Sequence, residues 1–337
     1  MRKEVVVAIL LGGIFGLLIA FGIWRINKIF SNSKGASPSP SAASLKTVAG
    51  LSIATPNDRA VLRESLVFFS GVTKASSLVV ISAETKDYIL GSDDKGEFSF
   101  EVELTGGLNE IKAFSLANEI VSKEKSILIV YSSEFPPLEE TSASENPPST
   151  SPGEIRERVR EKIDQKLKSP IAILGVVTDI ASQTIQVKDD SGEIKQLSVN
   201  KETTTFVKSL GPKSSKSVSL PDLAIGDFIL AMGLKNGNGV LDTKRVLITT
   251  PFVPSTRTAL TGEVANLSKN SLELKESGDD KILNISIDSS TRITQKNDDK
   301  VGSIKLSNLS VGDKIVIAGS PDDKKGSSIL ARRIHKI

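Results

Sequence analysis

The sequence predicts a mainly β protein with one N-terminal transmembrane helix, a β-sandwich, one charged linker helix and two tandem small β-barrels. Three observations lead to this fold class. Residues 5–24 are apolar and uncharged, and residues 51–131 alternate apolar and polar side chains in short runs between turn signals. The last half of the chain repeats one pattern with a period of about 87 residues.

These patterns divide the 337 residues into seven segments. They are a transmembrane anchor (1–30), a Ser/Pro-rich stalk (31–47), the β-sandwich (48–133), a Pro-rich linker (134–153), a charged amphipathic helix (154–169) and two β-barrel repeats (170–250 and 257–337).

The anchor is predicted from length and flanking residues. As a helix, residues 5–24 would span about 30 Å, the thickness of a bilayer core. A cleaved signal peptide is the alternative, but the run is longer than the usual apolar region and no small-x-small cleavage site follows closely. We therefore expect an uncleaved signal anchor and an integral, single-pass protein of the bacterial plasma membrane. The basic residues on its two sides nearly balance, so the stalk and the domains after it are the reason to expect those domains outside the cytoplasm.

Small residues form a stripe along this predicted helix. Ala8, Gly12, Gly16 and Ala20 recur every fourth residue and include a GxxxG motif, which permits close helix pairing in lipid. The sequence thus offers a face for self-association, although glycine and alanine are also common in membrane helices for other reasons.

The β-sandwich follows from alternation such as that of Phe98, Phe100 and Val102, which indicates strands with one buried face. About seven such strands in about 80 residues favour a sandwich. Landmarks in residues 51–131 resemble bacterial immunoglobulin-like modules of exported proteins; they are Ser70-Gly71-x-Thr73, Asp94-x-Gly96-x-Phe98 and Leu104-x-x-Gly107-x-Asn109-x-Ile111. The resemblance implies an Ig-like spacer or adhesive unit at the cell surface.

The linker helix begins with a capping box, Ser151 to Glu154, with Pro152 in the first turn. It should end before Pro170. Its narrow apolar stripe suits either one strand of a coiled coil or a solvated helix lying against the next domain, and its short length favours the second.

The tandem duplication covers residues 171–337. Its clearest pairs are Leu174-Gly175-Val176-Val177 with Thr261-Gly262-Glu263-Val264, Leu223-x-x-Gly226-Asp227 with Leu309-x-x-Gly312-Asp313, and Lys244-Arg245-Val246 with Arg332-Arg333-Ile334. Five or six alternating strands per copy suit a small closed, OB-like barrel, because closure removes exposed sheet edges.

The Gly-Asp pairs of the two copies are interpreted as structural turn landmarks. Gly226 and Gly312 suit turn positions with positive φ, and Asp227 and Asp313 can accept hydrogen bonds from the neighbouring backbone. The arrangement resembles a family of small, exported bacterial barrel domains of unknown function. That resemblance implies a barrel fold and no particular activity.

Catalytic chemistry has few candidates in this sequence. There is no cysteine and one histidine, His335, near the C-terminus. The acidic pairs at 93–94, 279–280, 298–299 and 322–323 lack the spacing of a calcium loop, and polar hairpin tips explain them. The chain is therefore predicted to be no enzyme, with no cofactor and no metal site.

The partner classes follow from charge and aromatic content. Net charge is only +3, and Phe206, Phe228 and Phe252 are the only aromatics after residue 170, so nucleic acid is an unfavoured partner. The basic pairs Lys244-Arg245 and Arg332-Arg333 could touch an anionic wall polymer or lipid head groups, but a solvated face explains them equally well.

We expect a non-catalytic bacterial envelope protein that presents its β domains for binding or scaffolding, with a cell-envelope polymer or protein as partner. Two alternatives stay open. One is a cell-wall or glycan-binding accessory protein. The other is an assembly or transport-adaptor subunit.

Overall fold

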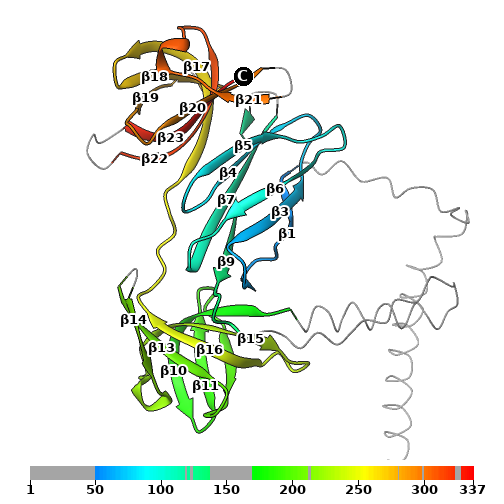
Figure 1. The fold of residues 1–337 in the computed structure, drawn as a ribbon, viewed down its shortest axis with the longest axis vertical. Coiled ribbons are helices and arrows are strands. Elements are labelled where there is room, and N and C mark those ends of the chain that lie inside the picture. Colours follow the sequence, from blue (N-terminus) through cyan, green and yellow to red (C-terminus); the bar gives the residue numbers. More distant parts are fainter. Residues whose placement is uncertain are drawn as a thin grey trace, which may run out of the picture. The chain divides into compact units, whose positions relative to one another are not determined.

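The computed structural model describes residues 50–117, 120–121, 124–136, 169–211, 214–279, 281–297, 300–322 and 328–337. Regular structure in this part of the chain consists of strands β1 to β23 and two short 3₁₀ turns (Figure 1). The mainly β character expected from the alternating pattern is confirmed. The contacts of residues Thr47–Ile337 join them into one unit.

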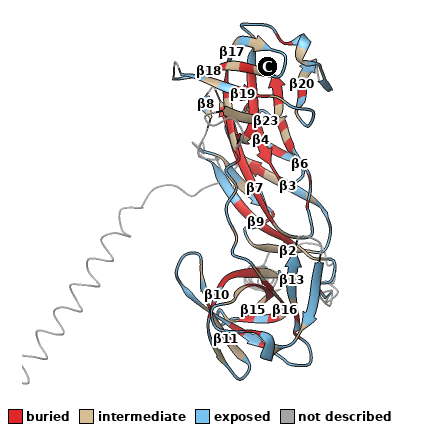
Figure 2. Ribbon diagram, turned by 90° about the vertical axis from the view of Figure 1, so that its left-hand side faces the viewer, coloured by how far each residue is buried: buried red, intermediate tan, exposed pale blue. Residues whose placement is uncertain are grey.

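Two sheets form the N-terminal sandwich. The first has the order β1-β3-β6, and the second has the order β2-β9-β7-β4-β5 with β8 paired to β7. Their bounds are β1 Ser52–Thr55, β2 Ala60–Leu62, β3 Leu66–Val72, β4 Leu78–Ser82, β5 Asp87–Gly91, β6 Glu97–Glu103, β7 Gly107–Ala117, β8 Ile120–Val121 and β9 Lys125–Tyr131. Alternate residues of the strands, such as Phe69, Val102 and Ile111, form the buried core of the sandwich. Figure 2 shows the buried stretches of β4 and β7 in red.

The first barrel is closed by a parallel pair of strands. Neighbouring strands follow the circular order β10-β11-β12-β16-β15-β10, in which only the β12–β16 contact is parallel. The hairpin β13–β14 extends this wall, because β13 also pairs in parallel with β16. The bounds are β10 Ile171–Ala181, β11 Thr184–Asp189, β12 Ile194–Val199, β13 Thr205–Gly211, β14 Ser214–Val218, β15 Phe228–Lys235 and β16 Leu241–Thr249.

The second barrel repeats this connectivity strand for strand. Its order is β17-β18-β19-β23-β22-β17, with the hairpin β20–β21 beside β23. The register irregularities also recur, at Val177/Asp179 and Val264/Asn266 and again at Met232/Gly233 and Ala318/Gly319. The bounds are β17 Thr258–Ser268, β18 Ser271–Glu276, β19 Ile282–Ser286, β20 Arg292–Asn297, β21 Lys300–Ser303, β22 Lys314–Pro321 and β23 Ser328–Lys336.

The membrane predictions are corrected by the structure. Within the described residues, no helix is long and apolar enough to cross a membrane, and the secondary structure there is strand apart from the two 3₁₀ turns. The fold class is therefore wrong in its transmembrane helix and its charged linker helix. The integral single-pass partnership and the plasma-membrane location, which depended on the first of these helices, are corrected with it. Residues 5–24 and 154–168, on which the two helices were predicted, lie outside the described part of the chain.

Candidate binding groove

Both barrels contact the sandwich through the same part of their outer surface. In the first barrel, Ala172, Leu174, Leu230 and Met232 pack into an apolar cluster with Val61 and Val130 of the sandwich and with Phe135, which follows its last strand. Three of the four equivalent positions in the second barrel are Ala259, Val316 and Ala318, which pack against Val80, Ile89, Phe114 and Leu116 of the sandwich. The duplication therefore preserved a docking face as well as a fold.

Main-chain hydrogen bonds also join the first barrel to the sandwich. Val61 N donates to the carbonyl of Pro170 (3.0 Å), and Ala172 N donates to the carbonyl of Arg59 (2.8 Å). The Arg59 guanidinium then reaches Asp190 on the β11–β12 turn at 2.6 Å. Because backbone ladders fix direction and register, this barrel is held in one orientation on the sandwich.

A buried ion cluster holds the start of the second barrel. Arg257, 6% exposed, donates to the carbonyl of Glu110 at 2.7 Å and to the Glu84 carboxylate at 3.1 Å. The Glu110 carboxylate accepts hydrogen bonds from the backbone and hydroxyl of Ser255 at 2.8 and 2.5 Å. Burial acts to raise the pKa of Glu110, but the bonds from Ser255 and the charge of Lys112 outweigh it, so the pKa lies below its ordinary value and the group stays ionised.

A second buried carboxylate lies under the closing strand of the same barrel. Asp87 accepts a hydrogen bond from Ser82 at 2.6 Å, and its carboxylate lies 3.4 Å from Nε of Arg332. Arg333 donates to the Asp87 carbonyl at 2.9 Å. Burial raises the pKa of Asp87, although Ser82 and the nearby arginines oppose the shift.

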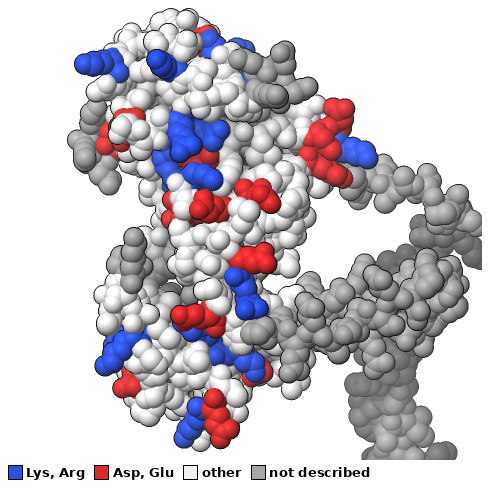
Figure 3. Space-filling model, in the orientation of Figure 1, with Lys and Arg blue, Asp and Glu red and all other residues white. Residues whose placement is uncertain are grey.

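The basic pairs at the barrel closing strands have internal partners. Arg332 and Arg333 contact the sandwich as described, Arg245 pairs with Glu134 and Lys244 pairs with Asp242. The two interpretations from sequence were a solvated face and a contact with a wall polymer. For Arg332 and Arg333 the structure shows a third role, contact with the sandwich. Acidic and basic side chains also intermingle over the face drawn in Figure 3.

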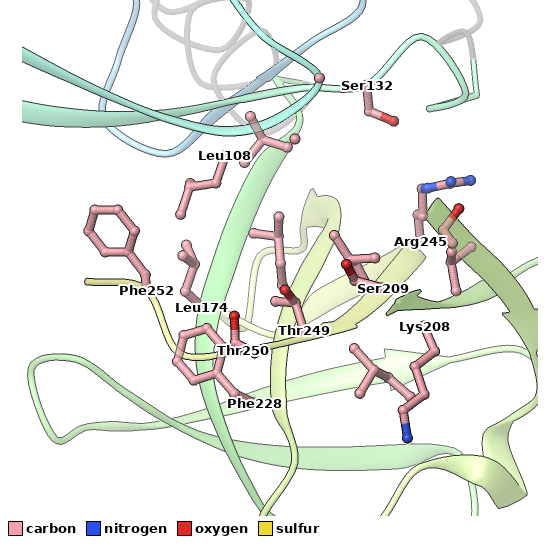
Figure 4. A pocket seen from close by; sticks show the side chains of 18 of the residues that line it. Leu108, Ser132, Leu174, Lys208, Ser209, Phe228, Arg245, Thr249, Thr250 and Phe252 are labelled. Atoms are coloured by element: carbon pink, nitrogen blue, oxygen red, sulfur yellow. The ribbon is translucent and has the colours of Figure 1, made fainter. Parts of the chain in front are cut away.

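An open groove lies where the sandwich meets the outer wall of the first barrel (Figure 4). Its volume is about 1020 Å³. Apolar side chains from both domains line it, among them Leu108 and Val130 of the sandwich and Leu174, Phe228, Leu247 and Phe252 of the barrel side. The segment 249–253 borders the groove, and there Val253 is 80% exposed.

Polar groups stand around this apolar surface. Hydroxyls come from Ser132, Ser209, Thr249 and Thr250, and the cations among the lining residues are Lys208 and Arg245. In Figure 4 Ser209 and Lys208 extend to different sides of their strand, as neighbouring residues of a strand must. An apolar surface with a few hydroxyls at its border is typical of a binding site for a partly apolar ligand.

The predicted landmark residues have separate places. Ala8, Gly12, Gly16 and Ala20 lie outside the described residues. Gly226 and Gly312 have φ values of 97° and 90°, and the carboxylates of Asp227 and Asp313 accept from Ala224 N at 2.9 Å and Ser310 N at 2.8 Å. Of these landmarks only Asp227 borders the groove. Sequence reasoning did not find the groove, because its lining comes from segments far apart in the chain, from Gly106 to Val253.

Among the described residues, no three histidine, cysteine, aspartate or glutamate side chains are close enough to hold an ion. At the hairpin tip before β6, Asp93 Oδ1 accepts hydrogen bonds from the backbone of Lys95 and Glu97 at 2.9 and 2.7 Å. That carboxylate oxygen serves the turn.

The histidine is buried in the second barrel. His335, 3% exposed, lies in β23 with its Nδ1 3.0 Å from the hydroxyl of Thr294. Burial, helped by the positive charges of Arg333 and Lys296, lowers the pKa of His335 below its ordinary value. The equivalent position in the first barrel is Leu247, as the pairing of β13 and β20 with their closing strands shows.

This burial predicts a pH dependence of stability. In the unfolded chain the pKa of His335 is about 6.5, whereas in the folded protein its pKa is lower, so the folded chain binds the proton only at lower pH. The contribution of the neutral His335 to stability is therefore fully present above the unfolded-state pKa. It is lost as the pH falls below that value, by up to about 1.4 kcal/mol per pH unit. Urea unfolding between pH 7.5 and 5.5 should show this loss. In His335→Leu, which carries the residue of the first barrel, the loss should be absent, and an unchanged pH slope in that variant would contradict the assignment.

No protein-family model matches the chain, and no curated protein matches it. Among solved structures, it is similar to a 1.5-MDa bacterial ice-binding adhesin, with 12% identity over 85% of this chain and 96% of the other and a TM-score of 0.16. It is also similar to a Ca²⁺-stabilised, ice-binding adhesin of an Antarctic bacterium, with 11% identity over 85% of this chain and 72% of the other and a TM-score of 0.17. Likenesses at these TM-scores support no argument about function. The Ig-like and barrel-family resemblances therefore stay predictions.

Proposed function

We propose that this protein is a non-catalytic binding scaffold whose ligand lies in the groove between the sandwich and the first barrel. The groove itself is the observation that carries the proposal. Its floor is built from side chains of two domains that backbone hydrogen bonds hold together, so the surface is preformed. A preformed site avoids the cost of ordering loops when a ligand binds.

A non-catalytic role agrees with the surroundings of the histidine. Thr294 and His335 form a hydroxyl–imidazole pair, the arrangement that activates a nucleophile in many hydrolases. Both residues are buried, with 5% and 3% of their surface exposed, and they lie in adjacent strands of the barrel. A substrate would have no access to that hydroxyl, so the pair serves the packing of β20 on β23.

The groove is tested with an apolar anionic dye, anilinonaphthalene sulfonate. We expect the dye to bind the folded chain with a rise in fluorescence, because the groove offers apolar surface beside Arg245. Thr249→Trp should weaken binding about tenfold, since the indole would fill space between the barrel wall and the segment 250–253. Fluorescence titration gives both affinities.

The matched control is Thr178→Trp, an exposed threonine of the same barrel that does not line the groove. It should leave dye affinity unchanged. Equal affinity in Thr249→Trp and the parent protein, with both folded by circular dichroism, would refute the groove as a ligand site.

A glycan ligand is a second candidate, because Tyr131, Phe228 and Phe252 all line the groove. Aromatic rings at a partly open surface can stack on the apolar faces of sugars. Soluble wall oligosaccharides should then displace the dye from the parent protein, and a failure to displace it would remove this candidate.

A further inference from the structure

The hairpin β13–β14 ends the sheet beside the groove, where one edge of β14 has no strand partner among the described residues. In the strand order β14 is terminal, and among the described residues its only strand partner is β13. Ser214 and Ser215 at its start line the groove. A free edge of this kind offers a row of backbone donors and acceptors to an added strand.

The two faces of this hairpin differ chemically. Val207, Ser209 and Ser215 line the groove, and Ser217, which pairs in register with Val207, shares their face of the hairpin. The residues between them occupy the opposite face, because side chains alternate along a strand. A strand added to β14 would therefore direct every second side chain to the groove side and the others to the opposite side.

The opposite face carries two lysines directly across from each other. Lys208 pairs in register with Lys216, both are exposed, and neither forms an ion pair with a described residue. Hydrogen bonds from Ser219 lower the pKa of the nearby Asp222, and the charges of Lys216 and Lys208 lower it further. The Asp222 carboxylate thus lies near the ammonium groups of both lysines. The two lysines themselves face each other across the β13–β14 ladder, and like charges placed in this way are destabilising.

The second barrel supplies an internal comparison. Its hairpin β20–β21 has the same pairing to the closing strand, but Gln295 and Gly302 stand at the positions of Lys208 and Lys216. The edge geometry is therefore common to both repeats, whereas the lysine pair belongs to the first.

We propose that β14 accepts an added strand from an extended peptide in which apolar and acidic residues alternate. The apolar side chains would lie on the groove side, and the acidic ones would face Lys208 and Lys216. This inference rests on the proposed function, because it names the ligand class of the same groove and adds the strand edge as the anchoring element. Backbone hydrogen bonds would supply affinity, and the alternation would supply specificity.

The probe is a synthetic heptapeptide of alternating valine and aspartate with blocked ends, titrated into the full chain labelled with ¹⁵N at low salt. We expect amide shifts and slowed hydrogen exchange at Ser214–Val218, and shifts at groove residues such as Thr249. The doubly substituted Lys208→Gln/Lys216→Gln should bind at least about tenfold more weakly, because each lost charge contact contributes a modest factor. Lys188→Gln, an exposed lysine on β11, is the matched control and should bind like the parent chain.

The outcomes separate this inference from the function on which it rests. Shifts confined to the groove, with no slowed exchange on β14, would overturn strand addition and leave the groove as a ligand site. Equal binding of a valine–lysine heptapeptide would overturn the acidic ligand class. Binding of oligothymidylate to β14 in place of the peptide would overturn it in favour of nucleic acid. No response to the valine–aspartate peptide from a chain that still binds the dye would overturn the inference alone, whereas a parent chain that binds no dye would overturn the proposed function and, with it, this inference.

Discussion

Replacing Arg257 with methionine is expected to lower the free energy of unfolding by about 3–5 kcal/mol. The guanidinium is buried, and it is the cation that contacts Glu84, the Glu110 carbonyl and the Glu110 carboxylate together. Without it, the carboxylate of Glu110, a residue that is 3% exposed, keeps hydrogen bonds from hydroxyl and amide groups and the influence of the Lys112 charge, but loses its ion pair. The cost of leaving a buried charge without its partner exceeds the usual effect of a surface substitution.

The double variant Arg257→Met/Glu110→Gln separates charge from packing. Because the second change removes the buried carboxylate charge left without its guanidinium partner, it should restore much of the loss. Lys86→Met is the control, since Lys86 and Glu103 form an exposed pair at 3.4 Å that should contribute at most about 1 kcal/mol. Urea unfolding followed by circular dichroism measures all four proteins. A loss below 1 kcal/mol in Arg257→Met would show that the cluster does not hold the second barrel.

Much of the fold could be predicted because it depends on local pattern. Alternation such as that of Phe98 and Val102 shows which side of a strand is buried, and the duplicated Gly226-Asp227 landmark shows that two units share one turn geometry. Both signals come from residues close together in the chain. They therefore locate strands and the repeat, but they do not indicate which surfaces of the folded units meet.

The groove and the ion clusters depend on which surfaces of the sandwich and the barrels pack against each other. Arg257 and Glu110 are 147 residues apart, and nothing in the spacing of either indicates the other. Arg332-Arg333 has the composition of a solvated strand face, and only the docking of the second barrel on Asp87 gives it a buried role. A sequence pattern can show that a strand face is charged. Whether that face is exposed to solvent or packed against another domain depends on the tertiary arrangement.

The second large prediction concerns the glycine shared by the repeated stretches Gly175-Val176-Val177 and Gly262-Glu263-Val264, tested by Gly175→Ala in the first barrel and Gly262→Ala in the second. A Cβ added at Gly175 would collide with the backbone carbonyl of Lys188, and one at Gly262 with the carbonyl of Lys275. The colliding atoms belong to the paired strand, so neither can move without breaking ladder hydrogen bonds of a closed barrel. We expect each substitution to cost about 3 kcal/mol, at the upper end for overpacking.

The controls are Gly237→Ala and Gly302→Ala, one in each barrel, where an added Cβ meets nothing within 4 Å. These should change stability by less than about 0.5 kcal/mol. Urea unfolding of the four variants tests steric need and repeat equivalence together. The contact is the same in both copies, so equal losses of stability at positions 175 and 262 would show that the duplication preserved a packing requirement. A tolerated alanine at either position would show that the strands of that barrel can move apart to make room. The landmark that revealed the repeat is thus expected to mark where each barrel has no room for a side chain.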